Sequence, residues 1–390
     1  MKKILCLLLA VVMLTMLAAC AKTPDNTPSG TTSGNTPSTS APGGDSAPTT
    51  ITVTDHAGNT VTVPRDIKRV VVGDIFPLPS VLTVFFDSAD RLVGIAPTSM
   101  AAAKNGLLSQ LYPEILNART DFMNGNKINL EELAKLEPDV VFYSANNTQQ
   151  GEELRSAGFA AVGISANNWG YNAIETLNQW IALLSQMFPD NDRAAIAKTE
   201  SEKIFDLVKE RTSSLTDDKK ARVFFLFQYN ESSILTSGKQ FFGEWWAEAI
   251  GAVNVAEELE KDNSVAVNLE QVYVWNPDVI FITNFTSAQP DALYNNTVGN
   301  YDWSGIKAVT DRAVYKMPLG MYRSYTPGID TPITLLWLAK TVYPELFSDI
   351  DVTARAVEYY KTVFGVELTT AQVESIFAPV SAAGNIDYKG

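Results

Sequence analysis

The sequence predicts an α/β protein with two similar lobes, each built on a parallel sheet, joined by a long rigid helix and separated by a cleft. Short apolar runs such as "RVVVGDIF" and "PDVIFIT" alternate with helical segments, which is the pattern of a parallel sheet covered on both faces. One motif also occurs twice, as "INLEELAKLEPDVVF" at residues 128–142 and as "VNLEQVYVWNPDVIF" at residues 267–281. This repeat indicates that a whole Rossmann-like lobe is duplicated.

The first 19 residues have the layout of a secretory signal. Two lysines precede an apolar run at residues 4–16, which is too short to cross a bilayer comfortably. The run leads into "LAAC", which resembles the lipobox of bacterial lipoproteins and predicts that Cys20 carries a lipid. An ordinary secretory signal with an incidental cysteine is the alternative. Because the other cysteine, Cys6, lies in the removed segment, no intramolecular disulfide is expected.

Residues 20–49 predict a flexible tether. Gly, Pro, Ser and Thr supply 21 of these 30 residues and no aromatic residue is present, so the segment cannot bury a core.

The formal net charge of −14 becomes −16 without the two signal lysines, which argues against nucleic acid as a partner. No later stretch is long and apolar enough to span a membrane. We therefore expect a monomer that is lipid-anchored at the outer face of the cell membrane.

The first lobe is predicted at residues 50–170. It begins with "TITVTDHAGNTVTVP", two alternating runs around Gly58 and Asn59 that predict a hairpin. His56, the only histidine, lies near this turn, and we expect a polar turn residue there rather than a ligand of a metal. Alternating strands and helices follow up to residue 170.

Residues 171–217 are predicted to be helical, and the second helix is expected to be a stiff rod between the lobes, with a crossover helix as the alternative. Asp190 or Asp192 is the predicted cap of this helix. Its apolar face is predicted to contain Ile196, Ile204, Leu207 and Val208.

The second lobe is predicted at residues 218–331. There "ARVFFLFQYN", the turn "TSGK" and the helix "QFFGEWWAEAIGA" precede the second copy of the motif. A helical region at residues 332–390, divided near Ser348, is expected to pack across a lobe.

The repeated motif contains two predicted capping boxes, in which an asparagine caps a helix and the residue three positions later bonds back to it. These pairs are Asn129 with Glu132, and Asn268 with Gln271. Capping leaves Glu131 and Glu270 unexplained. The helix dipole favours a carboxylate at that position, but both glutamates are expected to point to solvent, where they could engage a symmetric basic partner.

The order of these motifs resembles the order found in the substrate-binding proteins that serve ABC importers of ferric siderophores, haem and vitamin B12. The resemblance is carried by the lipobox, the tether, "TVTDHAGNTVTVPRDIKRVVV", both Asn-Leu-Glu runs, the long helix, "RVFFLFQ", "TSGK" and "VYKMP". It implies a cleft that binds a metal chelate, a rigid helix between lobes, and a permease dimer with its ATPase as partner. It also implies that Glu131 and Glu270 dock into arginine pockets of the permease.

The sequence predicts a binding protein rather than an enzyme, with no cofactor. HExxH, CxxC, P-loop and G-x-S-x-G patterns are absent, and a single histidine cannot complete a triad or the sites of manganese and zinc receptors. An extracellular enzyme that processes a cofactor and a structural cell-wall protein are weaker alternatives. The expected ligand is an iron chelate, haem or a corrinoid; a small oxyanion such as molybdate stays open.

Candidate ligand residues lie just beyond strand ends, where aromatic faces and a cation suit a flat or large anionic ligand. Arg323, in "GMYRSY", is the first candidate, because the resemblance places ligand contacts in this loop; a solvent-exposed arginine is the alternative. The other candidates are Met321, Tyr322, Tyr325, Tyr229, Trp245, Met100, Asn146, Trp169 and Asn284. For haem, Tyr322 or Met321 would have to supply the axial ligand.

Overall fold

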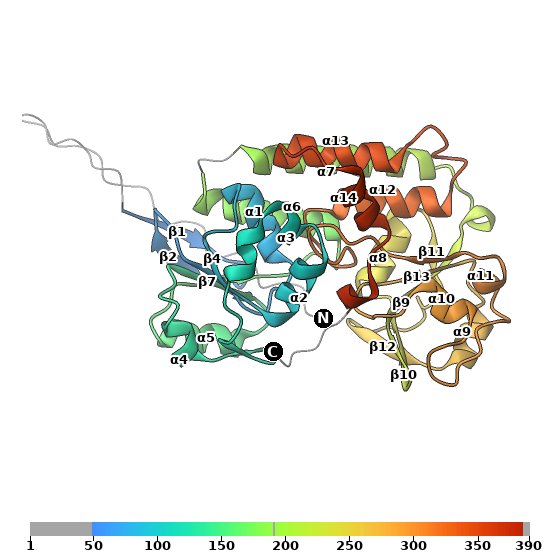
Figure 1. The fold of residues 1–390 in the computed structure, drawn as a ribbon, viewed down its shortest axis with the longest axis horizontal. Helices are drawn as coiled ribbons and strands as arrows, with labels where there is room; N and C mark the ends of the chain where they lie inside the picture. Colours follow the sequence, from blue (N-terminus) through green and yellow to red (C-terminus); the bar gives the residue numbers. More distant parts are fainter. Residues whose placement is uncertain (1–48, 190–191, 385–390) are drawn as a thin grey trace, which may run out of the picture. The chain divides into compact units, whose positions relative to one another are not determined.

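The computed structural model describes residues 49–189 and 192–384 (Figure 1). The predicted signal segment, Cys20, the tether up to residue 48 and Asp190 lie outside the described residues.

The described chain begins with an antiparallel hairpin of β1 (Thr50–Thr54) and β2 (Thr60–Pro64), as predicted. His56 is half-buried in the turn, where its Nδ1 accepts a hydrogen bond from the Ser165 N–H at 3.2 Å and its ring meets Trp169 edge-on. Burial lowers the pKa of His56. The lone histidine therefore fixes the hairpin to the first lobe, in agreement with the expected turn role.

Four parallel strands form the first sheet, in the order β4-β3-β7-β8. They are β3 (Val70–Val72), β4 (Leu92–Ile95), β7 (Val140–Ser144) and β8 (Ala161–Ile164). Their side chains are almost entirely buried, which explains the continuous apolar runs in the sequence. The predicted parallel sheet is confirmed for this lobe.

Short helices connect these strands. They are α1 (Leu78–Phe86), α2 (Pro97–Asn105), α3 (Leu108–Leu111), the 3-10 turn η1 (Pro113–Asn117), α4 (Leu130–Ala134) and α5 (Thr148–Ser156). A small hairpin of β5 (Met123–Asn124) and β6 (Lys127–Ile128) precedes α4. Proline at the first position of α2 fits the helix start, since that N–H has no intrahelical acceptor.

Two helices follow the first sheet, α6 (Ala173–Met187) and α7 (Arg193–Thr212). The 20 residues of α7 span about 30 Å, as a rod between the lobes requires. Ile204 and Val208 are buried as predicted. The prediction that Asp192 caps α7 is wrong: its backbone is already helical, so its side chain does not reach back to the free N–H groups.

The second sheet has the order β12-β10-β9-β13-β14, with β11 also paired to β9. Its strands are β9 (Arg222–Asn230), β10 (Ser233–Ser237), β11 (Val253–Asn254), β12 (Ser264–Val267), β13 (Val279–Ile282) and β14 (Val314–Lys316). Strands β9, β11, β13 and β14 are parallel, as predicted, whereas β10 runs antiparallel to both of its neighbours, β9 and β12. The difference arises because only residues 231–232 join β9 to β10, and so short a connection requires antiparallel strands.

The second lobe is completed by α8 (Phe242–Ala249), α9 (Leu269–Trp275), α10 (Pro290–Tyr294) and α11 (Lys307–Thr310), while the 3-10 turn η2 (Asp217–Lys219) leads into its first strand. The chain then forms α12 (Thr331–Val342), α13 (Val352–Phe364), α14 (Thr370–Phe377) and the 3-10 turn η3 (Ser381–Gly384). The break between α12 and α13 contains Ser348, as predicted. Helices α12 and α13 pack along α7 (Figure 1).

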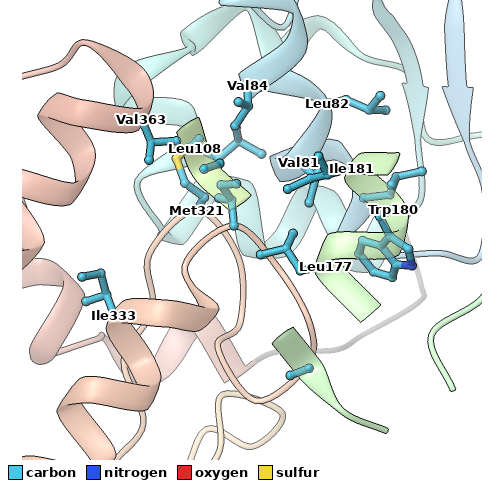
Figure 2. Close-up of a cluster of buried hydrophobic side chains, with 14 of the residues drawn as sticks. Val81, Leu82, Val84, Leu108, Leu177, Trp180, Ile181, Met321, Ile333 and Val363 are labelled. Carbon is cyan, nitrogen blue, oxygen red and sulfur yellow. The ribbon is translucent and has the colours of Figure 1, made fainter. Parts of the chain in front are cut away.

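One hydrophobic cluster connects the two lobes. It contains side chains from α1, α6, α12, α13 and the loop at residues 317–330, and Figure 2 shows Met321 of this loop among Leu108, Leu177 and Ile333. Two further clusters fill the outer faces of the two sheets. Loop 317–330 is therefore part of the core that joins the lobes.

Candidate functional site

Arg323 lies in loop 317–330, directly beyond β14, and its side chain is fully buried. Its Nη1 donates to the carbonyl of Thr98, at the start of α2, at 3.1 Å. Its Nε and Nη2 both donate to the carbonyl of Ala383, at 3.2 Å each, and the guanidinium lies 5.2 Å from the ring centroid of Phe285. Arg323 thus contacts the first lobe, the second lobe and the end of the described chain. The alternative of a solvent-exposed arginine is wrong, because these segments cover it.

Lys316 is a second buried cation at the same end of the second sheet. Its Nζ donates to the carbonyls of Thr283, Thr286 and Ala288 at 2.8, 2.6 and 2.8 Å, which fixes the loop at residues 283–288 after β13. Burial, with a smaller contribution from the charge of Arg323, lowers the pKa of Lys316 to about 7. Arg323 therefore brings positive charge to the strand ends, and Lys316 adds to it when it is protonated.

Three buried polar atoms around Arg323 have no hydrogen-bond partner within the described chain: Thr98 Oγ1, Asn284 Oδ1 and Ser324 Oγ. Thr98 is the residue whose carbonyl accepts from Arg323, Ser324 follows Arg323 in the chain, and Asn284 precedes the stacked Phe285. Each of the three residues is at most 4% exposed. Buried polar atoms are normally paired, so this gathering marks a place suited to a polar ligand.

An open groove of about 470 Å³ lies beside these residues. It is lined by residues 228–230 at the end of β9, by residues 285–287, and by Ser381, Ala382 and Gly384. The side chain of Tyr229 is held in place because its hydroxyl donates to the Val298 carbonyl at 2.9 Å and accepts from Trp303 Nε1 at 3.0 Å. The groove therefore lies at the strand ends of the second lobe, where ligands of open α/β sheets bind.

Residues 379–384, the C-terminal segment from here on, form one wall of the groove. Gln289 Nε2 donates to the Pro379 carbonyl at 3.2 Å, and Ala383 is fully buried against Arg323. The same segment contacts α2 of the first lobe.

Several predicted ligand residues belong to the core that shapes the site. Met321, Tyr325, Trp245 and Met100 all lie in the cluster that connects the lobes. The Tyr325 hydroxyl accepts from the Gly243 N–H at 3.1 Å, which holds loop 317–330 against α8. Tyr322 is buried beside Arg323, whose Nη1 donates to its hydroxyl at 3.3 Å.

Asn284 is fully buried and its Nδ2 donates to the carbonyls of Met317 and Pro318, both at 2.8 Å. Asn146 and Trp169 lie instead at the strand ends of the first lobe. Asn146 is exposed and donates to Asn167 Oδ1 at 2.8 Å, whereas Trp169 is half-buried against His56. Of the predicted ligand residues, Tyr229 lies at the groove, but its ring is packed in the core cluster of the second lobe, while Arg323 is next to the groove through its contact with Phe285. Asn146 and Trp169 do not line the groove.

Glu131 and Glu270 are both exposed near the start of their helices, α4 and α9. Neither carboxylate has an ion pair or a side-chain hydrogen bond with any described residue. Figure 1 shows α4 and α9 in different lobes, both on the side away from α7 and α13. The carboxylates are thus available to a partner.

The predicted capping boxes are correct only in part. Asn129 and Asn268 cap their helices: Asn129 Oδ1 accepts from the N–H of Glu131 and Glu132, and Asn268 Oδ1 accepts from the N–H of Gln271. The return bonds are absent from both caps. The Glu132 carboxylate pairs with Lys135 and Arg119, and the Gln271 amide donates to Glu258. For Glu132, the cations of Lys135 and Arg119 outcompete the neutral backbone N–H as donors to the carboxylate.

Sequence reasoning missed Lys316, Thr98 and the C-terminal segment. The signal for Lys316 was a lysine inside the apolar strand "AVYKMP", where a buried charge is unusual. The C-terminal segment carries no local signal, since small residues such as those of "SAAG" occur in any loop.

None of the helices in the described ranges is both long and apolar enough to cross a membrane. Within the same ranges, no group of three His, Cys, Asp or Glu side chains is placed to hold a metal ion.

A family model described as periplasmic binding protein matches residues 86–319, more than half of the chain. The chain belongs to this periplasmic binding protein family. The two-lobed architecture of the family agrees with the predicted fold class, which is thereby confirmed. Proteins of this family work outside the cytoplasm, as solute-binding proteins of ABC transporters and not as enzymes.

Three known proteins show how far the likeness extends. The molybdate-binding protein MolA of Haemophilus influenzae is 27% identical over 345 residues, which is 80% of this chain and 90% of MolA. Its molybdate-bound structure matches with a TM-score of 0.68. A periplasmic solute binding protein of Veillonella parvula matches with a TM-score of 0.75 and 26% identity, over 84% of this chain and 97% of that chain. CeuE of Helicobacter pylori with bound Ni(II), at 22% identity, covers 84% of this chain and 99% of that chain with a TM-score of 0.67, and shares the fold.

Proposed function

We propose that this periplasmic binding protein captures an anionic solute beside Arg323 and delivers it to the permease of its ABC importer. The observation that carries the proposal is the position of Arg323, whose guanidinium bonds to the first lobe through Thr98 and lies over Phe285 of the second. A charged ligand oxygen is a stronger acceptor for a guanidinium than the neutral carbonyl of Ala383. Lys316, whose pKa burial lowers to about 7, adds positive charge at the same strand ends when it is protonated.

An iron chelate, haem or a corrinoid is the ligand class that the groove favours. Its volume of about 470 Å³ lies in the range of sites for drug-sized ligands. Phe285 lines it, and its partly buried ring can stack on a flat or aromatic ligand. The hydroxyls of Thr98 and Ser324 would donate to its oxygen atoms, and Asn284 Oδ1 would accept from a donor group of the ligand.

A small oxyanion such as molybdate is the second candidate. It is favoured by the likeness to MolA, which covers most of both chains, and by the chemistry of the site. A guanidinium with neighbouring hydroxyl groups is the donor set that a compact oxyanion requires.

A binding panel separates these ligands. Sodium molybdate, haemin, cyanocobalamin and a ferric tris-catecholate are titrated into the purified protein, while tryptophan fluorescence and ligand absorbance are followed. Arg323→Met should weaken binding of the true ligand by about 10- to 100-fold, the equivalent of one lost charge-assisted hydrogen bond. Arg355→Met, a change on the surface of α13, is the control. Equal affinity of the two folded variants for the bound probe would refute the role of Arg323.

We also propose that Glu131 and Glu270 dock the protein onto a permease dimer with its ATPase. This is supported by the exposure of both carboxylates and by their equivalent places near the starts of α4 and α9. One carboxylate on each lobe can reach one basic pocket on each half of a symmetric partner.

Charge reversal tests the docking proposal. The double variant Glu131→Arg and Glu270→Arg should abolish uptake of the ligand by cells and leave its affinity for the purified protein unchanged. The matched control is Glu345→Arg with Glu374→Arg, two exposed glutamates in the C-terminal helical region. Normal uptake by the first double variant, or an equal loss in both, contradicts docking through these two side chains.

The lipid on Cys20 and the tether are proposed to keep the protein at the outer face of the membrane. Both rest on the sequence pattern of residues 1–49.

A further inference from the structure

The C-terminal segment occupies the position at Arg323 that a ligand oxygen would take. The Ala383 carbonyl lies between Nε and Nη2 and accepts from both at 3.2 Å. This edge of a guanidinium is the one that binds carboxylates and other oxyanions in fork geometry. A neutral backbone oxygen is therefore bound where a charged one would bind more strongly.

The segment is fitted closely to the loop that lines the groove. A Cβ atom on Gly384 would come within 1.9 Å of the Thr286 carbonyl oxygen and 2.5 Å of the Ser287 nitrogen, so only glycine fits there. Gln289 holds the beginning of the segment through the Pro379 carbonyl. Since Lys316 also holds the Thr286 carbonyl by a hydrogen bond, the segment lies against a fixed part of the loop.

Some buried polar atoms around Arg323 nevertheless lack a hydrogen-bond partner while the segment covers the site. The segment provides an acceptor for Arg323, but Thr98 Oγ1, Ser324 Oγ and Asn284 Oδ1 stay buried without a partner in the described chain. Each such atom destabilises the closed arrangement, because its bonds to water are lost and not replaced. A ligand with several oxygen atoms can accept from both hydroxyls as well as from the guanidinium. The segment is thus a weaker occupant than a polyoxygen anion.

We propose that residues 379–384 are a gate over the anion site, which closes the empty receptor and is displaced when the ligand binds. The gate deepens the proposed function and rests on it for the nature of the ligand. Because ligand and segment compete for Arg323, the apparent affinity of the full chain is reduced by the fraction of molecules in which the gate is open. Ligand binding also displaces residues 379–384, which distinguishes the loaded receptor from the empty one.

The cover over Arg323 can be tested without any ligand. Phenylglyoxal reacts with accessible guanidinium groups, and peptide mass spectrometry reports the reaction at each arginine. In the full chain Arg323 should react at least about tenfold more slowly than the exposed Arg65. Gly384→Val, whose side chain cannot fit against Thr286, and a chain that ends at residue 378 should both make Arg323 reactive. Val380→Ala, in an exposed part of the same segment, should keep it protected.

Binding of molybdate, haemin and the ferric tris-catecholate to the same variants completes the test. Gly384→Val and the shortened chain should bind the active probe at least about tenfold more tightly than the full chain. Unchanged or weaker binding, or an Arg323 that is equally reactive in every variant, would overturn the gate while the proposed function stands. If Arg323 becomes reactive in both variants but no anionic probe binds to any protein, the cover is established and the anion proposal fails.

Discussion

Replacing Lys316 with methionine should remove a pH dependence from the stability of this protein. Lys316 is 6% exposed, and its ammonium is held by the three carbonyls of loop 283–288. Burial lowers its pKa from 10.5 to about 7 in the folded state, while the unfolded chain keeps the ordinary value. The unfolded chain therefore binds the proton more strongly than the folded one between these two values.

The size and the sign of the effect follow from this difference. The depressed pKa corresponds to about 5 kcal/mol of preference for the neutral amine in the folded protein. Stability is lowest below pH 7, where both states carry the proton, and it rises as the pH passes from 7 towards 10.5. Between pH 7 and pH 9, before tyrosines in the unfolded chain ionise, the free energy of unfolding should rise by about 2 kcal/mol from this group.

Urea unfolding followed by tryptophan fluorescence at pH 6, 7, 8 and 9 measures the effect. The wild-type protein and Lys340→Met should show the rise; Lys340 is half-buried and its Nζ also donates to backbone carbonyls. Lys316→Met should not show it. If the free energy of unfolding rose with pH equally in the wild-type protein and in Lys316→Met, the depressed pKa of Lys316 would be refuted. The ammonium would then be hydrated or paired in the folded state.

Two further predictions concern the helix cap and the membrane anchor. Asn129→Ala should lower the free energy of unfolding by about 1 kcal/mol, because two N–H groups lose their acceptor. Glu132→Ala should lower it by less, since the Glu132 side chain does not complete a capping box. Thermal unfolding of both variants measures the two losses, and equal losses would contradict this prediction. Cys20→Ala should move the protein from the membrane fraction to the soluble extracytoplasmic fraction, and unchanged fractionation would count against a lipid on this residue.

The duplicated motif shows how much of the fold could be predicted from local sequence. Strands β7 and β13 and the helices before them form where the two copies predict them, because apolar runs and asparagine caps act over a few residues. The capping boxes failed at Glu132 and Gln271, whose partners Arg119 and Glu258 lie 13 residues away along the chain. Which of several polar partners a side chain takes is decided by what the fold brings near it.

The candidate site depends even more on distant contacts. Arg323 was a candidate from its place after a strand, but its burial results from Thr98 and Ala383, which are 225 and 60 residues away in sequence. Met321 and Tyr325 looked like ligand residues from the same loop, yet they pack in the core because loop 317–330 runs between the lobes. Proximity in a loop does not determine which side chains face a groove.

The sequence by itself therefore determined the class of the protein: two α/β lobes, a long connecting helix, and an exposed glutamate at each copy of the motif. These features follow from the spacing of apolar and capping residues, because both kinds of residue act over short stretches of chain. The tertiary structure alone decided that a buried arginine and lysine meet at the strand ends and that the C-terminal segment covers the arginine. Burial and charge pairing arise between segments far apart in the sequence, so they exist only once the chain has folded.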